Sequence, residues 1–305
     1  MLRFLFKRLF HGLAVIWVVA TLTFILLRLA PGGPFDRERK LPPEVLANVE
    51  AKYHFNEPLF SQYLRYLTGV MHADLGPSYK YLDRRVNQII AETFPTSALL
   101  GLLALVFALM LSFPAGLVAA RFRNSWLDRF ILLAATLGIS VPHFILGALL
   151  VWLFALQLGW LQAGRWDNAA SMILPAVTLG AAPAAYLAAL LRSSLIEALG
   201  EDFIRTARAK GLREGAVLLQ HALRNSLVPV LTVMGPLVAA LVTGSFVVEY
   251  VFAIPGMGRF FITAVTDRDY PLIMGVTLVY TTLLVAANFL VDLLYLVVDP
   301  RIRVY

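Results

Sequence analysis

The sequence predicts an all-α polytopic membrane protein with six transmembrane helices. Hydrophobic residues fill 59% of the 305 positions, and the mean hydropathy is +0.75. Soluble domains contain about 45–50% apolar residues, so this composition indicates a chain embedded in a bilayer. A helix needs about 20 mostly apolar residues to cross the hydrocarbon core. Six stretches are long enough: 9–30, 96–120, 127–158, 171–192, 227–250 and 272–298.

Prolines disturb three of these stretches. The third, 127–158, is too long for one straight span, and Pro142 near its middle predicts a kink or an interfacial helix start. Pro114 and Pro183 interrupt two others. Inside a membrane, backbone groups freed by a kink must be satisfied by neighbouring helices. We therefore expect the spans to pack as a bundle.

The distribution of lysine and arginine predicts the orientation. Basic residues concentrate in the N-terminus, in the second-to-third and fourth-to-fifth connections and in the tail, whereas the opposite side carries only Arg165, Arg259 and Arg268 in its short loops. By the positive-inside rule, both termini and the loop 197–225 are cytoplasmic. The net charge of +7 thus reflects topology, and no nucleic-acid-binding motif accompanies it.

The segment 31–95, between the first two spans, is too long for a simple connector and is placed outside by this topology. Residues 41–53, which contain two prolines near the start, predict a short helix. A second amphipathic helix is expected from Pro58, with one face formed by Leu59, Tyr63, Tyr66 and Leu67. The small helical segment is interpreted either as a lid over the bundle or as a docking surface. A further external element, 254–259, combines a Pro-Gly turn with a second flexible point at Gly258.

The loop 197–225 predicts a helix, a glycine turn and a second helix. In the first half, Glu201 and Arg205 are spaced for an i,i+4 ion pair, and the apolar stripe comprises Leu199, Phe203 and Ala207. Gly211 ends this helix, and a second run from Glu214 carries Val217, Leu218 and His221 at helical spacing. With a capping pattern from Ser194 to Glu197, these features favour a knob that docks into a groove. The alternative is a pair of amphipathic helices lying on the membrane surface.

Sites for chemistry are sparse. The sequence has no cysteine and no Walker A, G-x-S-x-G, H-E-x-x-H or kinase pattern, and its five histidines lack metal-ligand spacing. We therefore predict a non-catalytic chain without a cofactor or metal of its own. Asn288 and Asp292 lie four residues apart in the last span, where polar groups are costly and face a bundle interior or a cavity. They are candidates for the solute path, or else for interhelical hydrogen bonding, whereas Arg28 and Arg192 near span ends are expected to snorkel.

Several motifs resemble one protein family over essentially the whole chain. Residues 205–212, RTARAKGL, and 221–229, HALRNSLVP, resemble the EAA loop of ABC importer permeases in its peptide-type form. The segments GSFVVEYVFAIPGMGRF, RDYPL and DPRIR are similar to those of the B-type membrane subunit of bacterial oligopeptide permeases. Gly211 matches the family glycine, but Arg205 stands where the general motif opens with glutamate.

The resemblance implies an ABC type I importer permease fold in the bacterial inner membrane. It also implies a second homologous permease subunit, two cytoplasmic ATP-binding subunits that hold ATP and Mg, and an external peptide-binding protein. The chain would divide into 1–95, a permease domain 96–298 and a tail 299–305. The resemblance assigns contact with the ATPase to ten residues: Arg205, Thr206, Ala207, Arg208, Ala209, Lys210, Gly211, Leu212, Arg213 and Glu214.

Two other functions compete with this interpretation. A proton-coupled secondary peptide transporter would use Asp292, but it predicts inverted repeats and several midplane ionisable residues, which the sequence does not present. An intramembrane enzyme is disfavoured because the catalytic motifs are missing.

Overall fold

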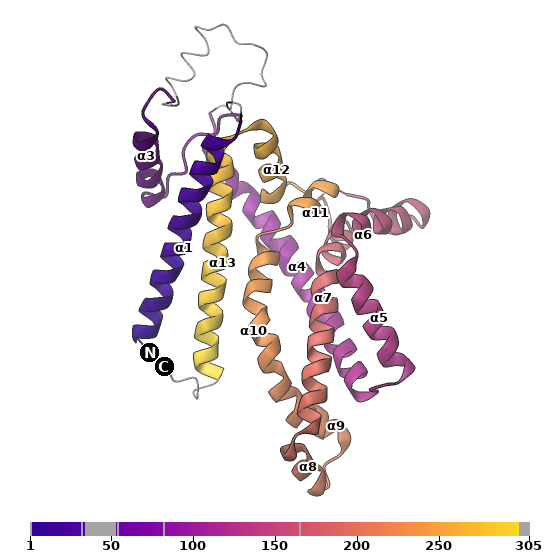
Figure 1. The fold of residues 1–305 in the computed structure, drawn as a ribbon. Helices are drawn as coiled ribbons and strands as arrows, with labels where there is room; N and C mark the ends of the chain where they lie inside the picture. Colours follow the sequence, from indigo (N-terminus) through magenta and orange to yellow (C-terminus); the bar gives the residue numbers. More distant parts are fainter. Residues whose placement is uncertain are drawn as a thin grey trace. The chain divides into compact units, whose positions relative to one another are not determined.

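The computed structural model describes residues 2–31, 33, 53, 55–81, 83–164 and 166–298. Within these ranges the chain is almost wholly helical, with an isolated antiparallel bridge between Pro77 and Arg85 and no named strand (Figure 1). The expected helix at 41–53 and the tail 299–305 lie outside the described residues, apart from Tyr53. The prediction of a helical membrane fold is confirmed.

Five stretches of the described chain are long and apolar enough to cross a membrane. A bent helix pair raises the number to six if it forms one span. The five are α1 (Leu2–Leu29), α4 (Val86–Arg121), α7 (Ala169–Gly200), the stretch Glu214–Val251 and α13 (Tyr270–Val298). The stretch Glu214–Val251 comprises α9 (Glu214–Ala216), the π-helix η2 (Val217–Ala222), α10 (Leu223–Val242) and α11 (Phe246–Val251).

The bent pair lies where the third span was expected. Helix α5 (Trp126–Ser140) ends just before Pro142. The next stretch, α6 (His143–Leu150) followed directly by the π-helix η1 (Val151–Gln157), makes an angle of 108° with α5 (Figure 1). Pro142 occupies the N-cap of α6, where its missing N–H breaks no helical hydrogen bond. The predicted kink is confirmed. Pro114 and Pro183, in contrast, lie within continuous helices, and neither ends its helix.

Capping explains several helix boundaries. Asn168 begins α7 with a capping box, because its side chain accepts a hydrogen bond from the Ser171 amide at 2.9 Å and Ser171 bonds back. Helix α7 then runs through 194–197, so the capping pattern predicted there starts no helix. The helix of the fifth predicted span is interrupted after Val242, where Gly244 adopts a φ of +83° between α10 and α11.

The described chain packs as two compact units. The first consists mainly of residues 1–96 and 255–286. Its core combines Phe24, Val86, Ile89, Met257 and Leu272. The amphipathic helix predicted from Pro58 is confirmed as α3 (Leu59–Met71), with Pro58 at the N-cap. Tyr63 and Tyr66 of the predicted face pack against this core, whereas Leu59 is exposed and Gln62, which was not predicted, is buried.

A corner of this first unit is fixed by a buried carboxylate. Asp269 precedes α13 and accepts hydrogen bonds from the hydroxyl of Ser78 and from the backbone amides of Tyr79 (3.1 Å), Lys80 (3.3 Å) and Leu272 (3.3 Å). The adjacent helix α12 (Met257–Asp267) begins after the predicted Pro-Gly turn. Gly258 is buried inside this helix, so the prediction of a second flexible point there is wrong.

The second unit consists mainly of residues 97–254 and 287–303. Its helices approach closely at two glycines. A Cβ at Gly101 would fall 2.0 Å from the Leu241 carbonyl oxygen of α10, and one at Gly180 of α7 would fall 2.6 Å from the Ala104 carbonyl oxygen of α4. The backbone of α4 therefore touches those of α10 and α7 with no side chain between them.

Candidate coupling site

Helix α8 (Asp202–Ala209) follows α7 after the single residue Glu201. Glu201 has an extended backbone and bonds its amide to the Ala198 carbonyl, which turns the chain without a long linker. Within α8, Ile204 and Ala207 are buried at i,i+3 spacing, and the remaining residues are exposed. The sequence pattern therefore gives a short helix with a narrow apolar stripe.

The seat of α8 is apolar. Ile204 and Ala207 belong to one core cluster with Leu195 and Ala198 of α7 and with Val217 of η2. The predicted stripe of Leu199, Phe203 and Ala207 is therefore wrong by one position at its centre. Phe203 is 38% exposed, and Ile204 takes the buried place instead. The exposed aromatic ring becomes available to a partner.

Gly211 closes α8 with a Schellman turn. Its amide bonds to the Arg208 carbonyl at 2.9 Å, and the Leu212 amide bonds to the Ala207 carbonyl at 3.4 Å. Gly211 has a φ of +76°, a conformation that glycine adopts without steric cost. The predicted helix break is confirmed, with α8 ending two residues earlier, at Ala209.

Charged side chains brace the turn from outside. The Arg208 guanidinium donates from Nε to Glu214 Oε1 at 2.8 Å and from an Nη atom to Oε2 at 3.2 Å. Hydrogen bonding to Glu214 raises the pKa of Arg208. Arg205 pairs with Asp202 at 3.3 Å, whereas the sequence predicted Glu201 as its partner. The predicted i,i+4 ion pair is thus replaced by an i,i+3 pair on the exposed face.

The ten predicted contact residues lie on one continuous segment, which comprises the end of α8, the Gly211 turn and the first residue of α9. Nine of them are exposed, and Ala207 is buried in the seat, where its side chain supports α8. The sequence analysis did not include Phe203 among the contact residues, although an aromatic residue next to the charged turn was a usable signal. The result is a compact knob, residues 201–214, whose exposed charges comprise four basic and three acidic residues.

The knob is attached directly to two spans. After the turn, α9, η2 and α10 follow one another without a break, since Ala222 and Leu223 at the junction are helical. The Ser226 hydroxyl of α10 donates to the Ser194 carbonyl of α7 at 3.1 Å. Because α7 and α10 are also packed together in the apolar cluster, a displacement of the knob must move both helices.

A buried ion pair that the sequence analysis missed lies in the same unit. The carboxylate of Asp128 in α5 accepts hydrogen bonds from Nε (2.5 Å) and an Nη atom (2.8 Å) of Arg192. It also accepts one from the Asn124 backbone amide at 2.8 Å. The prediction that Arg192 snorkels is wrong, because it is held by a carboxylate 64 positions away in the sequence. The pair fixes the start of α5 against α7. Arg28, in the first unit, lies over aromatic rings instead of extending to solvent. Its guanidinium carbon is 4.5 Å from the centre of the Phe55 ring.

Asn288 and Asp292 both lie in α13, four residues apart, and both are half-buried. This placement agrees with the shared helical face expected from their spacing. They are remote in sequence from the knob, and their role in a solute path stays a prediction.

Comparison with known proteins identifies the family. Residues 112–304 match the binding-protein-dependent transport system inner membrane component, and residues 1–101 match the N-terminal region of membrane components of such systems. The chain is 47% identical to the oligopeptide transport system permease protein OppB of Haemophilus influenzae, over 99% of this chain and 100% of that protein. It is 45% identical to the dipeptide transport system permease protein DppB of Bacillus subtilis, over 100% and 99% of the two chains.

A solved structure supplies the fold. A chain of the MetNI methionine ABC transporter, in an inward-facing conformation, matches with a TM-score of 0.55 at 19% identity, covering 70% of this chain and 97% of that one. The likeness shows the ABC type I importer permease fold, as predicted. The family models match both parts of the chain, and its fold is that of a solved importer permease. This multi-pass inner-membrane chain therefore belongs to the binding-protein-dependent transport permeases, the membrane subunits of ABC importers.

Proposed function

We propose that this chain is a pore-forming subunit of an ATP-driven importer of oligopeptides. The peptide cargo is supported by the names of the relatives, which are oligopeptide and dipeptide permeases at 44–47% identity over nearly their full length. The proton-coupled alternative receives no support from these relatives.

The observation that supports the mechanism is the packing of the knob against α7 and η2. Its inner face packs on an apolar seat formed by α7 and η2. Its exposed residues include Arg205, Lys210 and Arg213 as well as Phe203. We assign these exposed residues, the outer face of the knob, to contact with a cytoplasmic ATPase. Closure of the ATPases on ATP would push on α8, and α7 and α10 would follow as rigid bodies. This is the kind of displacement that switches a central cavity between two sides of a membrane.

The remaining parts of the assembly follow from this role. A second homologous permease would complete the pore, two ATP-binding subunits would hold ATP and Mg, and an external binding protein would deliver peptide. Both chain termini and the knob would face the cytoplasm, in agreement with the excess of arginine and lysine at those positions. Asn288 and Asp292 are proposed to line the solute path, because half-buried polar groups in a span suit a hydrated cavity.

The test is co-purification followed by a functional assay. The tagged chain would be extracted in mild detergent, its partners identified, and the complex reconstituted in nanodiscs. We expect two ATPases and a second permease, with hydrolysis stimulated by binding protein loaded with a tripeptide but not by empty binding protein. A complex with a hydrolysis-deficient ATPase is the control.

The alternative makes the opposite predictions. For a proton-coupled transporter, the chain would purify alone, and uptake into proteoliposomes would collapse with a protonophore and survive ATP depletion. That result would remove the importer proposal and make Asp292 the first residue to replace.

A further inference from the structure

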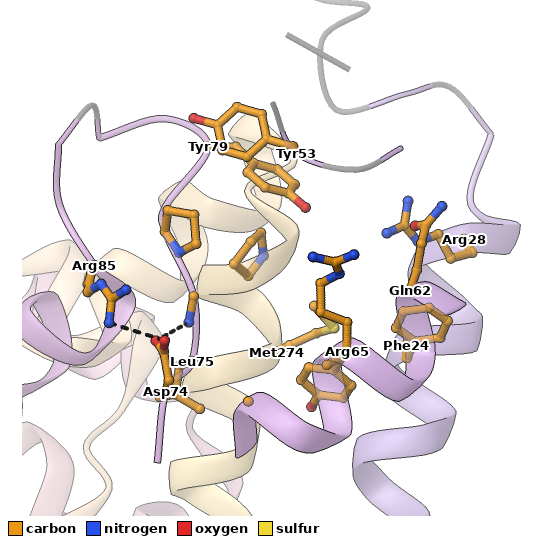
Figure 2. A pocket seen from close by; sticks show the side chains of 15 residues that line it. Phe24, Arg28, Tyr53, Gln62, Arg65, Asp74, Leu75, Tyr79, Arg85 and Met274 are labelled. Atoms are coloured by element: carbon orange, nitrogen blue, oxygen red, sulfur yellow. Dashed lines mark hydrogen bonds and ion pairs between the residues drawn. The ribbon is translucent and has the colours of Figure 1, made fainter. Parts of the chain in front are cut away.

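A cavity in the first unit is not used by the mechanism above. It has a volume of about 470 Å³ and lies between α1, α3, the segment 74–79 and the start of α13 (Figure 2). Ligand cavities in proteins measure about 300–1,000 Å³, so it is large enough for a small molecule or a headgroup. Four aromatic rings contribute to its wall, those of Phe24, Tyr53, Tyr66 and Tyr79.

Two polar atoms in the wall lack a partner among the described residues. Gln62 is only 8% exposed, and its amide nitrogen donates to the carbonyls of Phe55 (3.2 Å) and Glu57 (2.8 Å). Those bonds fix the amide group and leave its carbonyl oxygen buried with no donor; the hydroxyl of Tyr66 is likewise unsatisfied. Buried polar atoms are almost always hydrogen-bonded, so both atoms are available to bind a molecule in the cavity. Burial raises the pKa of Tyr66, and its hydroxyl therefore keeps its proton at neutral pH.

The cavity carries one uncompensated positive charge. Arg65 pairs with Glu57 at 2.5 Å. Arg85 pairs with Asp74 at 3.1 Å (Figure 2). Arg28 instead has its guanidinium carbon 5.3 Å from the centre of the Phe24 ring, and no carboxylate among the described residues pairs with it. A guanidinium in this setting selects an anion, and phosphate and carboxylate are its preferred partners.

The position of Arg28 indicates where the anion comes from. It is the basic residue in the last turn of α1, which is a membrane span. Only 11% of the most apolar part of α1 is buried, against 28–56% in the other four unbent spans. Val18, Ile25 and Leu29 form an exposed apolar row on α1, about 60–100° around the helix from Arg28. Acyl chains can lie along such a row while a headgroup reaches the guanidinium at the end of the helix.

We propose that this cavity binds the headgroup of an anionic glycerophospholipid, with the phosphodiester on Arg28 and headgroup hydroxyls donating to the Gln62 carbonyl oxygen and to Tyr66. Phosphatidylglycerol has this chemistry, because it combines one negative charge with two free hydroxyls. The single negative charge balances Arg28, and the hydroxyls satisfy the two orphan atoms. A lipid held here would fasten α1 to α3.

The experiment compares two lipids by native mass spectrometry of the delipidated, detergent-purified full assembly. The first probe is phosphatidylglycerol, and the second is phosphatidylpropanol, which has the same charge and a similar headgroup size but no hydroxyl. We expect one strongly bound phosphatidylglycerol per chain, with an apparent Kd about tenfold lower than that of phosphatidylpropanol. Equal binding of the two lipids would overturn the proposal.

Variants assign the contacts. Arg28→Gln should weaken both lipids by about tenfold, because it removes the phosphate partner. The matched control is Arg84→Gln, which removes the same charge from the same unit but from an exposed pair with Glu92 outside the cavity; both affinities should stay unchanged. Gln62→Leu and Tyr66→Phe should reduce the preference for phosphatidylglycerol. This preference is a ratio within one sample, so it remains measurable even if a variant folds poorly.

Competition distinguishes the source of the ligand. Soluble glycerol phosphate and a tripeptide would be added separately at millimolar concentration to the lipid-bound assembly. Retention of phosphatidylglycerol supports a lipid site. Displacement by glycerol phosphate would reassign the cavity to a soluble phosphate, and displacement by the tripeptide would reassign it to a peptide carboxylate; either result overturns the lipid proposal. None of these outcomes depends on the ATPase role of the knob.

Discussion

The Asp269 corner and the coupling knob are held in place by opposite means. At the corner, one buried carboxylate accepts hydrogen bonds from a hydroxyl and three backbone amides. At the knob, Ile204 and Ala207 rest on other apolar side chains, and the charged groups stay on the surface. Hydrogen bonds depend steeply on angle, whereas apolar contact does not. The corner therefore depends on the directions of its hydrogen bonds, whereas the knob depends on the apolar surface that it buries.

The largest effect should follow from Asp269→Asn. The amide that replaces one carboxylate oxygen would point N–H groups at donors, and buried donors would be left unsatisfied at about 1–3 kcal/mol each. We expect a loss of about 3 kcal/mol or more in the free energy of unfolding, measured by SDS titration of the purified protein. The control is Asp267→Asn, two residues earlier and only half-buried, with a loss below about 0.5 kcal/mol. Equal losses would show that the corner is not pinned by its carboxylate.

The next effect separates the seat of the knob from its outer face. Ile204→Ala removes a fully buried side chain and should cost about 2–4 kcal/mol, with loss of transport because α8 leaves its seat. Phe203→Ala, at the adjacent exposed position, should leave unfolding nearly unchanged while reducing the hydrolysis that loaded binding protein stimulates. The pair is read by SDS titration and ATPase assay together. Normal coupling in Phe203→Ala, or unchanged stability in Ile204→Ala, would contradict this division.

The smallest effect concerns the turn. Gly211→Ala places a Cβ in the left-handed region and should destabilise the turn by about 1 kcal/mol. Gly215→Ala is the matched control, because Gly215 lies in α9, where a Cβ meets nothing within 4 Å and alanine favours the helix. Protease cleavage within residues 205–214 should accelerate for Gly211→Ala alone. Equal cleavage rates would show that the positive φ does not hold the turn together.

The sequence predicted well what depends on local pattern. Long apolar runs located the spans, Pro142 located the bend and Gly211 located the turn, because each acts on its own neighbours along the chain. It failed where partners are distant in sequence. The ion pair of Arg192 with Asp128 joins residues 64 positions apart. Three of the four hydrogen bonds to Asp269 join residues 189 to 191 positions apart, and only the bond from the Leu272 amide is local. No periodicity marks such contacts.

The errors within the knob have a different origin. The stripe through Phe203 and the stripe through Ile204 are one residue, or about 100°, apart on a helix, and a helix of eight residues is too short to choose between them. The choice depends on the seat, where Ile204 is buried in one apolar cluster with Val217 and Leu195. Similarly, the capping pattern at Ser194 was overridden because α7 continues against α10, with the Ser194 carbonyl accepting the Ser226 hydroxyl.

The glycine contacts of α4 limit the number of independently moving parts. Where Gly101 meets the Leu241 carbonyl and Gly180 meets the Ala104 carbonyl, two peptide backbones are in direct contact, with no flexible side chain to absorb a displacement. A push delivered through α8 to α7 and α10 must then carry α4 along. In this respect α4, α7 and α10 form one rigid body that is moved through α8. Any larger side chain at Gly101 would force the backbones of α4 and α10 apart.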